Sequence, residues 1–167
     1  RWVKAHAGEY KIDPDRIGLL GASAGGHLAS LAAVTPEGAK PDAADPLDRP
    51  STDVAAVVAF FPPTDILQFG YLTFDETNVL KMPTLIVQLV FFQGRMPNRS
   101  PEELVAIFAS LSPTRLVNPK APPFLLVHGD SDIVVPLQQS QAFHKALKEA
   151  GVKTELVVLE GIGHGYT

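Results

Sequence analysis

Four short hydrophobic runs recur along the chain, and turn-forming residues follow each of them. The runs occupy residues 17–20, 54–61, 124–127 and 154–159. Each run carries few or no charges and is too short for a typical helix, so we expect strands that are buried within a sheet. Gly, Pro and Asp residues cluster after the runs, which predicts that the chain turns sharply at the end of each strand.

Segments with helical periodicity lie before and between these runs. We expect helices over residues 1–10, from Ser23 to near Thr35, from Ser100 to Leu111 and from Pro136 to Ala150. The last of them places apolar residues at i, i+3, i+4 and i+7 from Phe143 and ends at Gly151. The segment Thr84–Phe92 fits either a helix or a strand. Strands that alternate with helices or long crossovers predict an α/β fold, with a mostly parallel sheet and helices on both faces.

The composition narrows the class of protein. The chain has 167 residues, of which 46% are hydrophobic, and this is enough for one domain with a core; we assign residues 1–167 to a single domain. A net charge of −4 argues against a nucleic-acid surface. Without cysteine there is no thiolate metal site, and no pair of histidines has the spacing of metal ligands, so we expect neither a metal nor a cofactor. The run Met82–Gly94 is too short to span a bilayer.

Residues 16–28 contain the pattern Gly-x-Ser-x-Gly between a predicted strand and a predicted helix. This is the setting of a nucleophile elbow, in which a strained serine points its hydroxyl out of a tight turn. Ser23 is therefore the candidate nucleophile. We expect Gly21 and Gly25 to be required because the strand and the helix pass too closely for side chains. The N–H of Ala24, at the start of the helix, is the candidate oxyanion donor.

A serine nucleophile needs a base and an orienting carboxylate, and candidates for both follow later strands. Asp130 and Asp132 follow the run at 124–127, and His164 follows the run at 154–159. The order Ser, Asp, His is that of the α/β-hydrolases. The carboxyl ends of parallel strands meet at one edge of a sheet, so these groups are expected to converge there. Asp65, which follows the run at 54–61, is the rival acid.

The remaining candidates have simpler structural explanations. Asp130 is expected to be a turn residue that binds nearby backbone amides. His27 lies on the predicted elbow helix and is expected to pack or cap rather than act as a base. His128 ends a strand and is expected to be structural, whereas His6 and His144 are expected on helix surfaces or partly buried.

Several motifs give the chain a family resemblance. The sequence Asp-Pro-Asp-Arg-Ile precedes Gly-Ala-Ser-Ala-Gly-Gly-His-Leu-Ala, and Phe-Leu-Leu-Val-His-Gly-Asp-Ser-Asp-Ile-Val-Val-Pro and Gly-x-Gly-His-Gly-Tyr follow. Together they resemble the carboxylesterase and lipase branch of the α/β-hydrolase fold, with small acetylesterases, acetyl-xylan esterases and feruloyl-esterase-like proteins as the nearest group. The resemblance implies Ser23 as nucleophile, His164 as base and Asp132, the aspartate before x-x-Val-Pro, as acid.

The resemblance also implies parts that this sequence does not contain. Such hydrolases have a His-Gly-Gly-type oxyanion loop and several strands before the elbow, and usually a helix after the catalytic histidine. We therefore expect the chain to be truncated on its N-terminal side and after His164. The strand at Ile17 would then have a free apolar edge that invites self-association.

These observations favour a serine carboxylesterase that acts on short acyl or aryl esters through an acyl-enzyme. A peptidase similar to the prolyl oligopeptidases is an alternative, because it shares the elbow and the Asp-x-x-Val-Pro pattern. A third interpretation is a catalytically impaired hydrolase fragment that acts as a binding module. A small-molecule ester is the expected partner, without nucleic acid or a membrane span, and both a cytoplasmic and a secreted location are compatible with the sequence.

Overall fold

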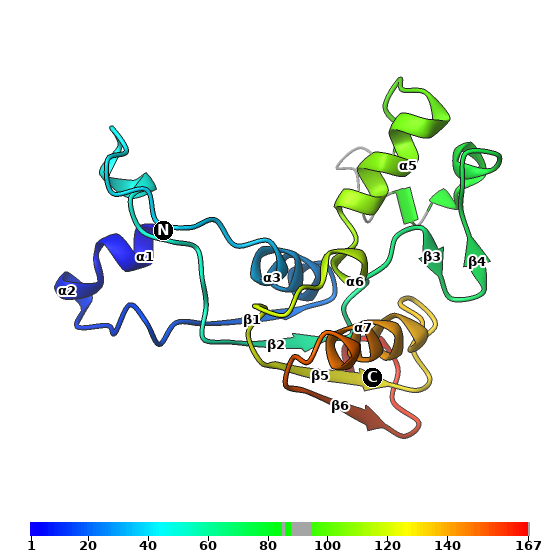
Figure 1. Ribbon diagram of the computed structural model, residues 1–167. Helices are drawn as coiled ribbons and strands as arrows, with labels where there is room; N and C mark the ends of the chain where they lie inside the picture. The colour runs from blue at the N-terminus through cyan, green and yellow to red at the C-terminus, as the bar shows by residue number, and fades with distance from the viewer. Residues whose placement is uncertain (85, 88–94, 167) are drawn as a thin grey trace.

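The computed structural model describes residues 1–84, 86–87 and 95–166, so most of the ambiguous segment Thr84–Phe92 lies outside the described residues. Its centre is a parallel sheet of four strands in the order β1-β2-β5-β6 (Figure 1). The strands are β1 (Gly18–Ala22), β2 (Ala56–Phe60), β5 (Phe124–Gly129) and β6 (Thr154–Leu159). They coincide with the four hydrophobic runs, so the predicted parallel α/β architecture is confirmed.

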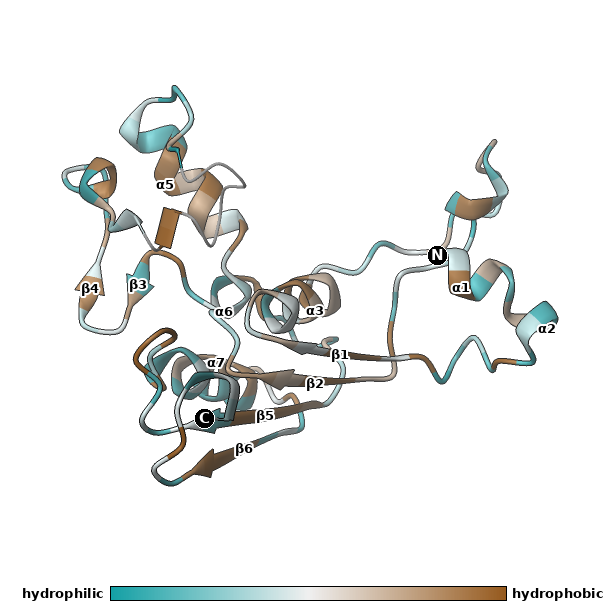
Figure 2. Cartoon of the chain, turned by 180° about the vertical axis from the view of Figure 1, so that it is seen from behind, coloured by the Kyte–Doolittle hydropathy of each residue, from teal (hydrophilic) through white to brown (hydrophobic). Residues whose placement is uncertain are grey.

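Three helices cover one face of this sheet. They are α3 (Ala24–Val34), α6 (Pro113–Leu116) and α7 (Gln138–Glu149). Figures 1 and 2 show all three on the same side of the strands. Their core is built from Ala33 of α3, Phe143 and Leu147 of α7, and Val57 and Leu126 of the sheet, all almost completely buried. The apolar stripes of the helices thus pack on alternate positions of the strands.

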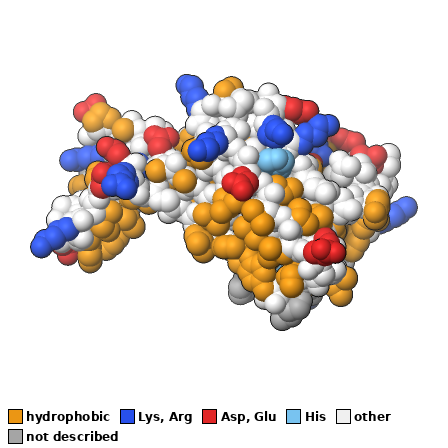
Figure 3. Space-filling model, turned by 90° about the horizontal axis from the view of Figure 1, so that it is seen from below, with side chains coloured by type: hydrophobic (Ala, Val, Ile, Leu, Met, Phe, Trp, Pro, Cys, Tyr) orange, Lys and Arg blue, Asp and Glu red, His pale blue; other side chains and the backbone are white. Residues whose placement is uncertain are grey.

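The opposite face of the sheet is not covered by any helix of the described part of the chain. Strand register places Leu20, Val58, Leu125 and Glu155 side by side on this face. Leu20 is 72% exposed, and Figure 3 shows hydrophobic side chains gathered on this side of the molecule. The expectation of helices on both faces is therefore wrong for these residues. Parallel strands are apolar on both faces, which is why the pattern predicted two layers of helices.

A second hydrophobic cluster lies beyond the carboxyl ends of the strands (Figure 1). It includes Ile66, Leu104, Phe108 and Val135. The elements around it are β3 (Gln68–Phe69), β4 (Leu72–Thr73), the 3₁₀ helix η2 (Val79–Lys81) and α5 (Pro101–Ser110). The predicted start of α5 is confirmed by a capping box, in which the Ser100 hydroxyl accepts from the Glu103 N–H and the Glu103 carboxylate accepts from the Ser100 N–H.

The N-terminal segment forms two short helices rather than the single helix that was expected. They are α1 (Trp2–Ala5) and α2 (Ala7–Tyr10). Elsewhere in the chain, η1 (Pro46–Asp48) and η3 (His164–Tyr166) are 3₁₀ turns. The break falls at His6, whose ring stacks on that of Trp2 with the centroids 4.2 Å apart and whose Nδ1 lies 2.8 Å from the Trp2 carbonyl oxygen. Among the described residues, no helix is long and apolar enough to cross a membrane.

Candidate active site

Ser23 lies in the sharp turn between β1 and α3 that the sequence predicts. Its φ of 53° and ψ of −121° are unfavourable for a residue with a side chain. Two backbone hydrogen bonds hold the turn: the Ser23 N–H donates to the Phe60 carbonyl at 2.9 Å, and the Ser23 carbonyl accepts from the His27 N–H at 2.9 Å. The surroundings thus impose the strained conformation that projects the serine side chain from the turn.

The glycines of the elbow have unequal roles. A Cβ atom on Gly21 would lie 2.2 Å from the Gly25 carbonyl oxygen, so Gly21 must be glycine. A Cβ atom on Gly25 would meet nothing within 4 Å, which corrects the steric reason expected for that position. On the helix it is instead Gly26 that faces close neighbours, because its Cβ would lie 3.1 Å from the Gly21 carbonyl oxygen. The strand therefore approaches the backbone carbonyl of Gly25, whereas the position of a Gly25 side chain is open.

His164 connects the other two candidate residues. Its Nδ1 lies 2.7 Å from Asp132 Oδ2, and its Nε2 lies 3.1 Å from Ser23 Oγ. A carboxylate only accepts hydrogen bonds, so Nδ1 carries the proton and Nε2 is left to accept from the serine hydroxyl. The three residues come from the ends of β1, β5 and β6, and the structure therefore brings Ser23, Asp132 and His164 together in the order needed for proton transfer.

The Asp132 carboxylate is fixed within its own loop. Its Oδ1 accepts from the backbone N–H groups of Val134 at 2.9 Å and Val135 at 2.8 Å. These bonds leave Oδ2 for the imidazole of His164. The side chain is fully buried, and a buried carboxylate that accepts several hydrogen bonds keeps one orientation.

The rival carboxylates make other contacts. Asp65 pairs with Arg115, whose Nε lies 2.9 Å from Oδ1, and it also accepts from the Leu67 N–H. Asp130 accepts from the Gly161 N–H at 2.7 Å and from the Ser131 hydroxyl at 3.1 Å. Asp65 thus secures a loop, while Asp130 binds the loop that carries His164 as well as its own turn.

The other histidines are engaged elsewhere. His27 donates from Nδ1 to the Pro63 carbonyl at 2.9 Å, and burial lowers its pKa. The His144 ring lies 3.1 Å from the Thr154 hydroxyl, and burial lowers the pKa of this imidazole also. His128 is completely buried beside Asp132, with its Nε2 3.4 Å from Oδ2. Of these three imidazole rings, that of His128 contacts a candidate site residue, Asp132.

Two residues that position the site were not singled out by the sequence. Gly129 ends β5, and a Cβ atom there would lie 2.0 Å from the Ile162 carbonyl oxygen, so the loops before Asp132 and His164 can approach only at a glycine. That carbonyl accepts from the Ser131 N–H at 3.1 Å. Phe61, at a φ of 38°, places its ring 4.5 Å from that of His164. The sequence offered two signals for these positions: Gly129 closely follows the hydrophobic run 124–127, and the aromatic Phe61 directly precedes Pro62.

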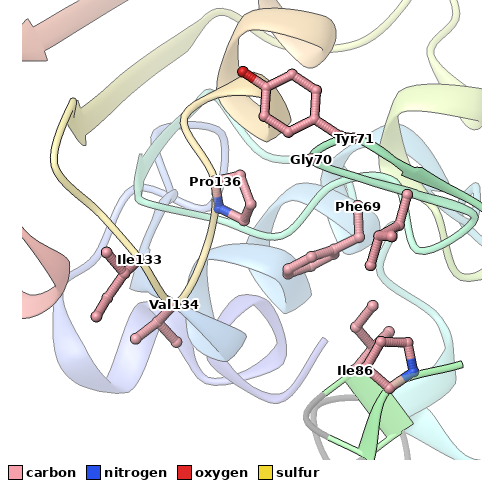
Figure 4. A pocket seen from close by; sticks show the side chains of 9 residues that line it. Phe69, Gly70, Tyr71, Ile86, Ile133, Val134 and Pro136 are labelled. Carbon is pink, nitrogen blue, oxygen red and sulfur yellow. The ribbon is translucent and has the colours of Figure 1, made fainter.

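An apolar pocket of about 390 Å³ opens beside the acid loop (Figure 4). Phe69 and Tyr71 line it from the β3–β4 hairpin, and Val134 and Pro136 line it from the segment that follows Asp132. Figure 4 shows the Phe69, Val134 and Pro136 side chains around the same space. Within the described ranges no group of three or more His, Asp or Glu side chains could hold a metal ion.

Comparison with known proteins shows the family and the fold of this chain. The BD-FAE family matches residues 1–147. The chain is 36% identical over 148 residues to the probable carboxylic ester hydrolase LipM of Mycobacterium tuberculosis, which is 89% of this chain and 31% of LipM. It also resembles the acetyl ester-xyloside bifunctional hydrolase of Caldicellulosiruptor lactoaceticus, with a TM-score of 0.77, 30% identity and coverage of 98% of this chain and 53% of that chain.

A third similar structure is the thermophilic esterase Est2 of Thermogutta terrifontis with propionate bound. The TM-score is 0.68 at 28% identity, over 99% of this chain and 52% of that chain. The chain thus spans about a third of LipM and about half of the two solved structures. It belongs to the BD-FAE family and has the α/β-hydrolase fold.

Proposed function

We propose that this chain carries the catalytic residues of a serine carboxylic-ester hydrolase. Ser23 Oγ attacks the ester carbonyl carbon while His164 Nε2 takes the hydroxyl proton. His164 then gives this proton to the leaving alcohol, and an acyl group remains on Ser23. Next, His164 removes a proton from water, which attacks the acyl-enzyme and releases the carboxylic acid. Asp132 orients His164 and stabilises the imidazolium that forms in both steps.

The position of His164 is the observation that carries this proposal. One imidazole has Nδ1 2.7 Å from a buried carboxylate and Nε2 3.1 Å from the hydroxyl of a strained serine. A merely structural histidine in a surface loop has no reason to bridge residues that are 141 and 32 positions away in the sequence. Esterase names among the similar proteins support the same reaction.

We assign oxyanion stabilisation to the Ala24 N–H. Ala24 is the first residue of α3, and the first N–H groups of a helix have no partner within the helix. The positive end of an 11-residue helix adds to the stabilisation of the negative charge that develops on the carbonyl oxygen. This mechanism requires no metal and no cofactor.

Short acyl or aryl esters are the substrate class that we propose. The pocket of about 390 Å³ is lined by Phe69, Tyr71 and Val134, the last of which lies in the loop after Asp132, and it fits a small apolar group. The structure of Est2 with propionate bound, which this chain resembles, also favours a short acyl group. No contact observed in the described residues favours a peptide substrate over an ester.

Labelling with a fluorophosphonate tests the proposal. We expect one adduct on the intact chain by mass spectrometry and none on Ser23→Ala, with equal circular dichroism spectra. Nitrophenyl esters and aminoacyl-proline amides, compared on the same sample, separate the esterase from the peptidase. A folded chain that gains no adduct, or a Ser23→Ala chain that still hydrolyses esters, would overturn the assignment.

We further propose that the chain associates with itself through β1 and the uncovered face of the sheet. In the described part of the chain β1 pairs on one side only, with β2, and Leu20 is 72% exposed. An unpaired apolar edge of this kind favours pairing with another chain. The size of the particle in solution tests this proposal.

A further inference from the structure

Two serine–histidine pairs meet on the same carboxylate. His164 binds Asp132 Oδ2 from one side and faces Ser23. On the other side His128 Nε2 lies 3.4 Å from the same oxygen, and His128 Nδ1 lies 2.7 Å from Ser140 Oγ. The first pair is part-buried and belongs to the site, whereas His128 and Ser140 are completely buried between β5 and α7. The proposed mechanism leaves the buried pair without a role.

The contacts of His128 determine where its proton lies. Nε2 faces the Val135 carbonyl oxygen at 2.9 Å and Asp132 Oδ2, and both groups only accept hydrogen bonds. Nε2 therefore carries the proton. In the neutral ring Nδ1 is then free of hydrogen and accepts from the Ser140 hydroxyl. The Val135 carbonyl and Asp132 thus select the tautomer of His128, and the Ser140 hydroxyl supplies the hydrogen bond that Nδ1 then needs.

The surroundings of His128 keep the ring neutral. It is fully buried, and burial is the main cause that lowers its pKa. The titratable groups that face it among the described residues are Asp132 and His164. A charged His128 would place a second imidazolium beside Oδ2 and compete with the His164 imidazolium that forms during the reaction. A neutral donor holds the carboxylate without this competition.

We propose that His128, whose Nδ1 is hydrogen-bonded to Ser140, is a positioning residue that holds Asp132 in place for His164. The inference rests on the proposed esterase function for its catalytic consequence. His128 contacts both Asp132 and the Val135 carbonyl, and the Val135 N–H itself binds Asp132 Oδ1. The ring therefore supports the acid directly and through the backbone that orients it.

The experiment compares three variants of the whole chain with the wild type. His128→Gln retains an uncharged N–H donor, whereas His128→Phe fills the space without one. Ser140→Ala keeps the ring but removes the hydroxyl. Ser30→Ala is the matched control, because Ser30 is equally buried in α3 and its hydroxyl makes no hydrogen bond to the described residues. Long-range ¹H–¹⁵N spectra of the histidine rings and the rate of fluorophosphonate labelling are measured for each.

We expect His128 of the wild type to carry its proton on Nε2 and to stay neutral at about pH 6, where free imidazole is partly charged. His128→Phe should slow labelling between about tenfold and about a hundredfold, as small misplacements of catalytic groups do. It should also weaken the Nδ1–H signal of His164. His128→Gln should restore both. Ser140→Ala should keep the proton on Nε2, because the Val135 carbonyl and Asp132 still face it, and should slow labelling by less than His128→Phe because Nδ1 loses its donor. Ser30→Ala should change neither.

The outcomes separate this inference from the proposed function. If no variant is labelled at Ser23, the esterase proposal fails, and the ring spectra still decide the role of His128. A wild-type His128 with its proton on Nδ1 would overturn the inference. The same follows if His128→Phe, or Ser140→Ala where the former does not fold, leaves the His164 signal and the labelling rate unchanged.

Discussion

Asp132, the candidate acid, follows an inner strand of the sheet, whereas Ser23 and His164 follow its two edge strands, β1 and β6. β5, which precedes Asp132, is paired on both sides, with β2 and β6. The loops after β5 and β6 are joined by hydrogen bonds from the Asp130 N–H to the Leu159 carbonyl and from the Ser131 N–H to the Ile162 carbonyl. β1 pairs only with β2 among the described residues. Hydrogen bonds between two loops therefore position the candidate acid and base, whereas the candidate nucleophile is positioned by its own tight turn.

The difference shows that Ser23 is positioned mainly by the backbone contacts of its own strained turn. The position of Ser23 depends on the contact between Gly21 and the Gly25 carbonyl and on the bond from its N–H to the Phe60 carbonyl. On the other side, hydrogen bonds between loops hold Asp132 without a strained backbone at that residue. Each side should therefore fail through a different kind of substitution.

Asp132→Asn should have the largest effect and breaks the acid side. The Val134 and Val135 N–H groups require an oxygen at the Oδ1 position, so the amide nitrogen must face His164. It would donate to Nδ1 and force the imidazole proton onto Nε2, which could then no longer accept from Ser23. We expect a loss of about 10⁴-fold in ester hydrolysis, similar to that of an equivalent change in another triad.

Asp130→Asn is the matched control for this substitution. Its Oδ1 can still accept from the Gly161 N–H after the change, so the loop that carries His164 should keep its position. Hydrolysis rates of the two variants and the wild type are measured under the same conditions. Equal losses in both variants would contradict the assignment of the acid to Asp132.

Gly21→Ala should come next and breaks the nucleophile side. The new Cβ would lie 2.2 Å from the Gly25 carbonyl oxygen, so β1 and α3 must move apart and Ser23 with them. A shift of about 1 Å corresponds to a loss of about a hundredfold in the labelling rate. Gly25→Ala is the control, because its Cβ meets nothing within 4 Å. Equal labelling of both variants would show that the close approach does not position Ser23.

The sequence predicts much of this arrangement because turns and strands have local causes. The four runs became the four strands, and the elbow pattern at Ser23 forms the expected turn with a positive φ. The Ser100 capping box is equally local. The positions after the strands also predicted that the ends of β1, β5 and β6 would bring together Ser23, either Asp130 or Asp132, and His164. The family resemblance selected Asp132, and the catalytic roles stay predictions.

Features that depend on packing could not be predicted from the pattern. The single layer of helices was missed because Val58 and Leu125 are as apolar as the residues on the covered face. Two contacts join elements that are separated in the sequence. Gly129 at the end of β5 meets Ile162 in the loop after β6, and His128 of β5 is hydrogen-bonded to Ser140 of α7. Nothing in a single sequence specifies which backbone passes closest to which side chain.

Acid should weaken both sides of the molecule, although less than the substitutions above. Burial lowers the pKa of His128 on the acid side and of His27 on the elbow helix. Below the unfolded pKa of about 6.5 the unfolded chain binds protons that the folded chain does not. The free energy of unfolding should therefore decrease as the pH is lowered below about 6.5. The decrease should be at most about 1.4 kcal/mol per pH unit for each histidine.

Urea unfolding between about pH 7 and about pH 5 measures this dependence. His128→Gln and His27→Gln should each make the slope shallower, and the double variant should be shallower still. The two single variants then report how strongly each side opposes the charged form of its histidine. Slopes identical to that of the wild type in both variants would contradict a lowered pKa at these two residues.

Leu20→Lys should have the smallest effect on the chemistry and tests the uncovered face. Leu20 is 72% exposed on β1, and an apolar contact between two chains at this position would stabilise association by at most about 1.5–3 kcal/mol per leucine. We expect the wild type to elute above the 17.9 kDa monomer in size-exclusion chromatography with light scattering, and Leu20→Lys to elute as the monomer. Leu80→Lys, at a residue 61% exposed in η2, should leave the size unchanged. A wild-type chain that stays monomeric over the whole concentration range would contradict self-association through β1. It would show that pairing with β2 alone is enough to keep β1 folded in solution.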